Sequence, residues 1–236
     1  MRVFLSVLML VLISAFAPVG AYAAPKADLW PDWQAHDPDS MQKIDHSGWQ
    51  AVLDRFVAQP EPGVTTFDYK AALDDRANGI EAVAGYVGKM VTVPVSDLNR
   101  NQQLAYWINL YNALTVKVVL DHYPVASIRD IDISPGLFSL GLFSSGPWDK
   151  KLITVEGRTL SLNDIEHRIL RPIWKDPRIH YAVNCASVGC PNLMRKAYTP
   201  ARMEKLMEKA ARKYINNARG VRVDREGLVV SSIYVW

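Results

Sequence analysis

Apolar residues recur at spacings of three and four along much of the first half of the chain, a pattern typical of helices that bury one face. Short helices are predicted over residues 49–58 and 80–90. The longest periodic stretch predicts a helix over residues 97–122, which Ser96 caps and Pro124 ends. The apolar stripe of this helix consists of Leu104, Trp107, Ile108, Tyr111, Leu114, Val118 and Val119.

In the second half of the chain, short strands are mixed with helices. Hairpins are predicted around residues 156–157 and 226–227, and a further strand over residues 179–184. A basic amphipathic helix is predicted over residues 200–218. Because helices come first and strands later, the order of elements favours an α+β fold in which N-terminal helices pack on a small, mostly antiparallel sheet.

The N-terminal residues have the three parts of a cleavable signal peptide. Arg2 supplies the positive charge, residues 3–18 form an apolar run, and Ala21 and Ala23 are the small residues that signal peptidase reads. The run is shorter than the roughly 20 residues that a membrane-spanning helix needs. We therefore expect cleavage after Ala23, a periplasmic or secreted protein, and no membrane anchor after cleavage.

Composition restricts the class of protein further. Residues 24–46 are rich in Pro, Asp and Trp and predict an extended lead-in, whereas residues 47–236 are enough for one domain with its own core. The formal charge of +3 is too small to indicate a nucleic-acid partner. The sequence contains no glycine-rich phosphate loop, GxSxG turn or HExxH helix, and we expect no cofactor and no metal.

The densest group of reactive side chains lies in a loop that contains both cysteines of the chain. In one hypothesis Cys185 is a nucleophile, with His167 as the base that forms the thiolate. Asp164 shares a helix face with His167 and is placed to orient it, whereas the adjacent Glu166 points about 100° away. Asn184, next to Cys185, would support an oxyanion.

Two other hypotheses use the same cysteines. Cys185 and Cys190 are five residues apart, a separation that a disulfide can close, and an oxidising compartment favours one. A metal site with His167 or His180 is the weakest hypothesis, since four ligands at familiar spacing are not visible. We do not expect His180 to face Cys185, because residues five apart on a strand point to opposite faces. The thiol and disulfide hypotheses stay open.

Other polar residues have structural explanations. Asn109 and Asn112 lie three apart on an apolar helix and are expected to be buried amides that satisfy nearby backbone. Ser161 and Asp164 have the spacing of a capping box at the start of a helix. Residues 134–147 are rich in Gly, Ser and Phe and predict a loop that covers a cleft.

Three blocks of the sequence resemble the motifs of one protein family. They are residues 101–114 (NQQLAYWINLYNAL), 160–167 (LSLNDIEH) and 176–191 (DPRIHYAVNCASVGCP). In this order the blocks resemble the domain of unknown function 547, found in bacteria and plants, and the resemblance extends roughly from Tyr69 to the end of the chain. The Glu-His and double-Cys motifs of the family fall on Glu166, His167, Cys185 and Cys190.

The resemblance carries limited functional information, because the family name gives no activity. Its motifs suggest a thiol enzyme, and its intracellular plant members imply that a disulfide is not obligatory. We therefore expect a thiol-dependent hydrolase or acyltransferase that uses Cys185 and His167, with Asp164 or Glu166 to orient the histidine and Cys190 beside them. The alternative is a non-catalytic periplasmic binding or scaffold domain with a Cys185–Cys190 disulfide. The expected ligand is a small molecule or peptide that the sequence does not identify.

Overall fold

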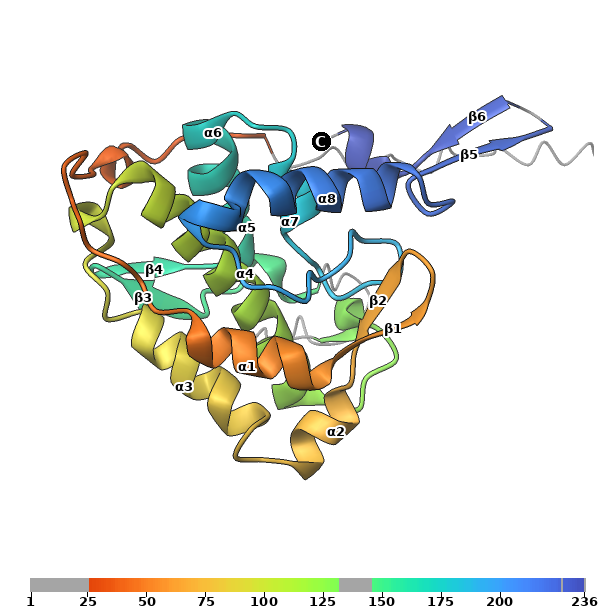
Figure 1. Ribbon diagram of the computed structural model, residues 1–236, viewed down its shortest axis with the longest axis horizontal. Coiled ribbons are helices and arrows are strands. Elements are labelled where there is room, and N and C mark those ends of the chain that lie inside the picture. Colours follow the sequence, from red (N-terminus) through yellow and green to blue (C-terminus); the bar gives the residue numbers. More distant parts are fainter. Residues whose placement is uncertain (1–25, 132–145, 226, 236) are drawn as a thin grey trace, which may run out of the picture.

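The computed structural model describes residues 26–131, 146–225 and 227–235 (Figure 1). The α+β prediction is confirmed, with the strands of this part of the chain arranged as three separate antiparallel hairpins. The helices are α1 (Ser47–Phe56), α2 (Tyr69–Asp74), α3 (Ile80–Met90), α4 (Arg100–His122), α5 (Leu162–Asp164), α6 (Arg171–Trp174), α7 (Ile179–Ala182) and α8 (Met203–Ile215). The strands are β1 (Val57–Glu61), β2 (Val64–Phe67), β3 (Ile153–Val155), β4 (Arg158–Leu160), β5 (Val221–Asp224) and β6 (Gly227–Val230).

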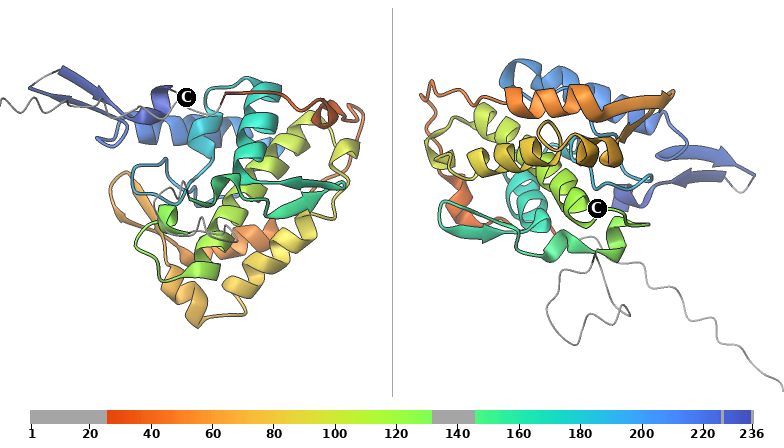
Figure 2. Two further views of the ribbon diagram at one scale, coloured as in Figure 1. Left: turned by 180° about the vertical axis from the view of Figure 1, so that it is seen from behind. Right: turned by 90° about the horizontal axis from the view of Figure 1, so that it is seen from below.

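The centre of the fold is α4, which lies between the pair α1 and α3 on one side and the segment from α5 to α7 on the other (Figures 1 and 2). Every residue from 102 to 116 is buried. This burial is wider than the one-sided stripe that the sequence predicts, because neighbouring elements cover α4 on all sides. The indole of Trp107, for example, meets the edge of Trp33 from the lead-in at a ring-centroid distance of 5.0 Å.

The two asparagines of α4 are buried and bind backbone, as predicted. Asn109 donates from Nδ2 to the carbonyl of Tyr198 at 2.7 Å and accepts from the amide of the same residue at 2.9 Å. Asn112 donates to the carbonyl of Ala182 at 2.9 Å and accepts from the amide of Asn184 at 2.8 Å. Each amide therefore joins a segment of the second half of the chain to the central helix and satisfies two of its backbone groups.

Several local predictions are confirmed. Strands β3 and β4 pair in register around the turn at Glu156 and Gly157, whose φ angles of 45° and 77° are those of a tight hairpin turn. The capping box is present, since the Ser161 hydroxyl accepts from the amide of Asp164 while the Asp164 carboxylate accepts from the amide of Ser161. The amphipathic α8 buries Met203, Leu206, Met207, Ala210 and Tyr214 as expected.

Two predictions are wrong, one about the type of an element and one about the start of a helix. The strand expected over 179–184 is instead the short helix α7, which follows a turn where Asp176 accepts from the amide of Arg178 at 2.9 Å. A short apolar run fits a strand and a buried helix equally well, so the spacing of its hydrophobic residues does not distinguish the two. The cap of α4 is Asn99 and not Ser96, because Ser96 lies in a 3-10 turn and binds Glu156 instead.

One hairpin was not predicted from the sequence, and one predicted loop lies almost entirely outside the residues that the structure describes. The Pro-rich stop after α1 forms the hairpin of β1 and β2, in which Pro60 occupies an edge strand. The loop expected to cover a cleft over 134–147 falls almost entirely outside the described residues.

The lead-in packs against a π-helical turn, Ile165–Leu170, that links α5 to α6. A 3-10 turn, Pro31–Gln34, interrupts the lead-in and buries Trp33. Before this turn, the amide of Asp28 donates to the carbonyl of His167 at 3.0 Å and the amide of Trp30 donates to that of Arg168 at 3.2 Å. These bonds fix the lead-in along the outer side of the π-helical turn, where it forms one wall of a cavity.

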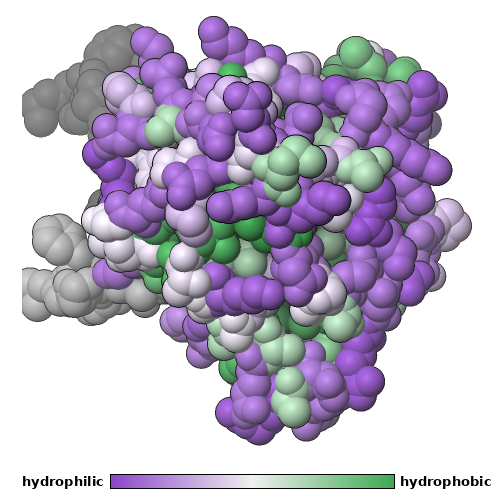
Figure 3. Space-filling view, turned by 60° about the vertical axis from the view of Figure 1, so that its left-hand side comes forward, coloured by the Kyte–Doolittle hydropathy of each residue, from purple (hydrophilic) through white to green (hydrophobic). Residues whose placement is uncertain are grey.

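Within the described ranges, none of the helices has the length and apolar character needed to cross a bilayer. The face shown in Figure 3 is mostly hydrophilic, with hydrophobic residues gathered in a band near its middle.

Candidate functional site

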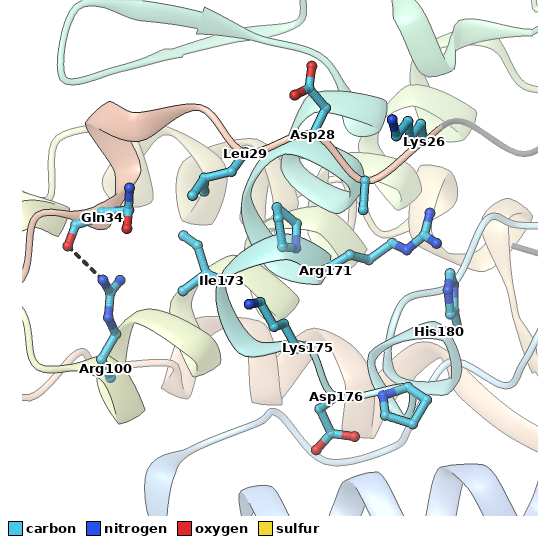
Figure 4. A pocket seen from close by; sticks show the side chains of 13 residues that line it. Lys26, Asp28, Leu29, Gln34, Arg100, Arg171, Ile173, Lys175, Asp176 and His180 are labelled. Carbon is cyan, nitrogen blue, oxygen red and sulfur yellow. Dashed lines mark hydrogen bonds between the residues drawn. The ribbon is translucent and has the colours of Figure 1, made fainter.

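An open cavity of about 840 Å³ lies between the lead-in, α6 and α7 (Figure 4). Its volume is within the range of pockets that hold small-molecule ligands. The lining residues come from three separate parts of the chain: Lys26, Ala27, Asp28, Leu29, Gln34, Arg100, Arg171, Pro172, Ile173, Lys175, Asp176, Pro177 and His180.

Cationic side chains outnumber carboxylates in this lining. The four cations are Lys26, Arg100, Arg171 and Lys175. Arg100 donates to the backbone carbonyl of Gln34 at 2.6 Å, a contact that holds the guanidinium without neutralising it.

The two carboxylates of the lining, in contrast, are paired with arginines outside it. Asp28 forms an ion pair with Arg168 at 2.6 Å, and Asp176 forms one with Arg178 at 2.7 Å. The charge that faces the cavity is therefore positive, which favours an anionic ligand.

Beneath this lining, a buried carboxylate lies between two histidines. Glu166 is only 5% exposed, and its Oε1 is 3.1 Å from Nδ1 of His180. Its Oε2 is 4.0 Å from Nε2 of His167. On the other side of His167, Nδ1 is 2.8 Å from a guanidinium nitrogen of Arg171, which lines the cavity. The π-helical turn and the first residue of α6 thus bring Glu166, His167 and Arg171 into one connected group.

Burial and charge set the protonation of this group. Burial raises the pKa of Glu166, but the hydrogen bond from His180 and the positive charge of Arg171 outweigh it, so that the net pKa is lowered. Burial lowers the pKa of His167 despite the neighbouring Glu166. Burial, reinforced by the charge of Glu166 and a hydrogen bond to it, raises the pKa of Tyr111. At neutral pH the group therefore has an ionised carboxylate, a neutral His167 and a protonated Tyr111.

The two cysteines are joined in a disulfide, Cys185–Cys190, with their Cα atoms 6.1 Å apart. This is the pairing that the alternative hypothesis requires. In the bonded form Cys185 has no thiolate, and nucleophilic attack by its sulfur would first need reduction.

The predicted oxyanion donor also has a structural role in this loop. Asn184 donates from Nδ2 to the carbonyl of Pro191 at 2.6 Å and accepts at Oδ1 from the amide of Ala186 at 3.0 Å. Its side chain therefore closes the loop that contains the disulfide.

The carboxylate beside His167 is Glu166, and not Asp164 as helix geometry suggests. Asp164 is engaged at the start of the helix, where it accepts from the amide and hydroxyl of Ser161 at 2.7 and 2.8 Å and pairs with Lys151. A regular α-helix would turn Glu166 away from His167, but the wider π-helical turn and the overlying lead-in leave both residues buried.

The sequence analysis weighs His180 only as a metal ligand and does not predict its contact with Glu166. The strand predicted over 179–184 turns His180 away from Cys185, whereas helix α7 places its ring against Glu166 and in the wall of the cavity. The available signal was the run from Asp176 to Arg178, whose turn chemistry can start a short helix.

The family model described as "Protein of unknown function, DUF547" matches residues 95–215, which is more than half of the 236 residues. The chain belongs to this family. The resemblance seen in the sequence is therefore confirmed. No curated protein and no solved structure matches the chain.

The DUF547 region supplies the chemistry of the site, and residues before it supply one wall. Glu166, His167, Arg171 and His180 lie inside the matched residues, as do both cysteines. Lys26 and Asp28 precede them. Among the described residues, no group of three or more His, Cys, Asp or Glu side chains is placed to hold a metal ion.

Proposed function

We propose that this DUF547 protein binds a small anionic ligand in the cavity between the lead-in, α6 and α7. The observation that carries the proposal is the charge of the lining, in which four cations face the cavity while both carboxylates are paired with arginines outside it. Carboxylate and phosphate groups suit such a lining, because guanidinium groups bind them through two parallel hydrogen bonds and ammonium groups act as point charges.

The proposal includes export of the protein. The pattern over Arg2 to Ala23 supports cleavage by signal peptidase, and the Cys185–Cys190 disulfide supports an oxidising compartment. N-terminal sequencing of the protein from the periplasm or medium tests this part. A mature chain that begins at Ala24 is expected, whereas an uncleaved cytoplasmic chain would contradict export.

In this proposal the disulfide stabilises the loop and takes no part in chemistry. A thiol-dependent hydrolase or acyltransferase with Cys185 and His167 is the competing proposal, and it applies to the reduced protein. The oxidised loop favours the binding role, since neither sulfur is a thiolate while the bond is intact.

The test of the binding role is a calorimetric titration of the folded protein with succinate and with inorganic phosphate. At least one of the two is expected to bind with a stoichiometry of about one, and Lys175→Gln is expected to weaken that binding by about fivefold. Lys209→Gln, on the exposed side of α8, is the matched control and leaves binding unchanged. If neither anion binds, or if both variants weaken binding equally, the proposal is wrong.

A further inference from the structure

Among the described residues that line the cavity, His180 is the only histidine, and its ring lies against the buried carboxylate of Glu166. The side chain is 12% exposed, so the ring is largely enclosed yet still reaches the cavity. Glu166 Oε1 lies 3.1 Å from Nδ1, within hydrogen-bonding distance. An ionised carboxylate only accepts hydrogen bonds, so Nδ1 must hold the proton of a neutral imidazole. The lone pair is then on Nε2, which points away from Glu166.

A fixed cation lies beside this base. Figure 4 shows the side chains of Arg171 and His180 directed toward one another in the wall of the cavity. The guanidinium of Arg171 is anchored on its other side by Nδ1 of His167, at 2.8 Å. Since the lowered pKa of His167 keeps that imidazole neutral, it accepts from Arg171 without cancelling its charge. The cation is thus held in place before any ligand enters.

We infer that the cavity hydrolyses carboxylic esters whose acyl group carries a second, anionic group, with His180 as general base and Glu166 as the residue that positions it. This inference rests on the proposed binding of anions, because Lys26, Arg100 and Lys175 are left to hold the anionic end of the substrate. It uses neither cysteine, and so it differs in mechanism from a thiol enzyme.

The reaction needs only water as a co-reactant. Nε2 of His180 takes a proton from a water molecule as the water oxygen bonds to the ester carbonyl carbon. The carbonyl electron pair moves to oxygen, and the resulting oxyanion lies beside the guanidinium of Arg171. When the oxyanion collapses, the bond to the alcohol oxygen breaks, and that oxygen takes the proton from Nε2. The products are a carboxylic acid and an alcohol, and His180 returns to its starting form.

The kinetic test uses the 4-nitrophenyl monoesters of succinate and glutarate with the full oxidised protein. His180→Gln is expected to lower kcat at least about 100-fold while KM changes little, because the base acts in the transition state. His122→Gln is the matched control, since His122 lies at the exposed end of α4 and bonds only locally to Val118 in the described structure. Neutral 4-nitrophenyl acetate is expected to react with a much higher KM.

Glu166→Gln tests the positioning role with a readout that folding alone does not change. A glutamine amide can donate to Nδ1 and so move the imidazole proton to Nε2, which removes the base without removing a side chain. Nitrogen NMR of His180 is expected to show the proton on Nδ1 in the native protein and on Nε2 in the variant, together with a loss of kcat. The same tautomer in both proteins would contradict the role given to Glu166.

The failure of this inference is distinguishable from failure of the proposed function. If succinate binds but the monoesters are not hydrolysed, or are hydrolysed equally by His180→Gln, the binding role stands and the catalytic one is wrong. Hydrolysis of 4-nitrophenyl phosphate in place of the acyl esters would also overturn the assignment. If succinate and phosphate both fail to bind, the proposed function itself fails.

Discussion

The carboxylate of Glu166 lies 3.1 Å from the imidazole of His180, although the two residues belong to different helical segments. Glu166 comes from the π-helical turn and His180 from the short helix α7. Burial makes the contact energetically important, because a buried ionised group that loses a partner is not compensated by water. The pair therefore connects the stability of the fold to the geometry of the cavity.

Glu166→Leu is expected to lower the free energy of unfolding by about 2 to 4 kcal/mol, since His180 and Tyr111 lose a buried partner. Urea denaturation followed by tryptophan fluorescence measures this change. Glu208→Leu removes a surface ion pair with Arg212 and is expected to change stability by less than about 1 kcal/mol. Equal effects of the two substitutions would contradict the importance assigned to the buried pair.

Asn109→Leu is expected to destabilise the protein by about 2 to 4 kcal/mol, because the buried amide and carbonyl of Tyr198 both lose their partner. Asn101→Leu is the control on the same helix, as its side chain is exposed and its effect stays within about 0.5 kcal/mol. The same denaturation experiment compares them. A small effect at Asn109 would show that its two hydrogen bonds to the backbone of Tyr198 contribute little to stability.

The burial of His46 is expected to make the free energy of unfolding depend on pH. Its Nδ1 lies 2.7 Å from the buried hydroxyl of Tyr86, and burial lowers its pKa to about 4, from 6.5. Below pH 6.5 the unfolded chain takes up a proton that the folded protein does not, so the contribution of His46 is full above pH 6.5 and falls as the pH approaches 4. The loss amounts to about 3 kcal/mol.

Urea midpoints across this pH window check that prediction. The native protein is expected to lose stability more steeply with falling pH than His46→Gln, which has no titrating ring at this position. Other buried groups, including His167, titrate in both proteins, so the difference between the two curves isolates His46. Parallel curves would contradict the assignment.

The disulfide gives a prediction about mass and stability. Alkylation of exported, non-reduced protein is expected to add no label, and alkylation after reduction two labels, at Cys185 and Cys190. Replacing both cysteines with serine is expected to cost about 2 kcal/mol, the value for a short closed loop. Labelling without reduction would mean free thiols and would return the thiol hypothesis to first place.

Local chemistry was predictable from the sequence where neighbouring residues determine it. The capping box of Ser161 and Asp164 and the turn at Glu156 and Gly157 depend on side chains within a few positions of each other. The backbone-binding roles of Asn109 and Asn112 follow from an amide on an apolar helix face, although their partners do not.

The centre of the cavity was not predictable, because it depends on contacts between distant segments. Glu166 and His167 lie in a π-helical turn, His180 comes from α7, and the lead-in binds the π-helical turn through the carbonyls of His167 and Arg168. The contact of His180 with Glu166 was not predicted, since the four residues of α7 are too few to show a helical period.

Both proposals require an anion to occupy the cavity beside Arg171 and His180. An NMR titration of the native protein with succinate tests this occupancy, with side-chain signals of the two residues assigned from Arg171→Lys and His180→Gln. We predict saturable shifts of the Arg171 guanidinium and His180 imidazole signals, while the signals of the exposed His122 stay unchanged. Binding that leaves Arg171 and His180 unperturbed would place the anion elsewhere, and both proposals would then be wrong.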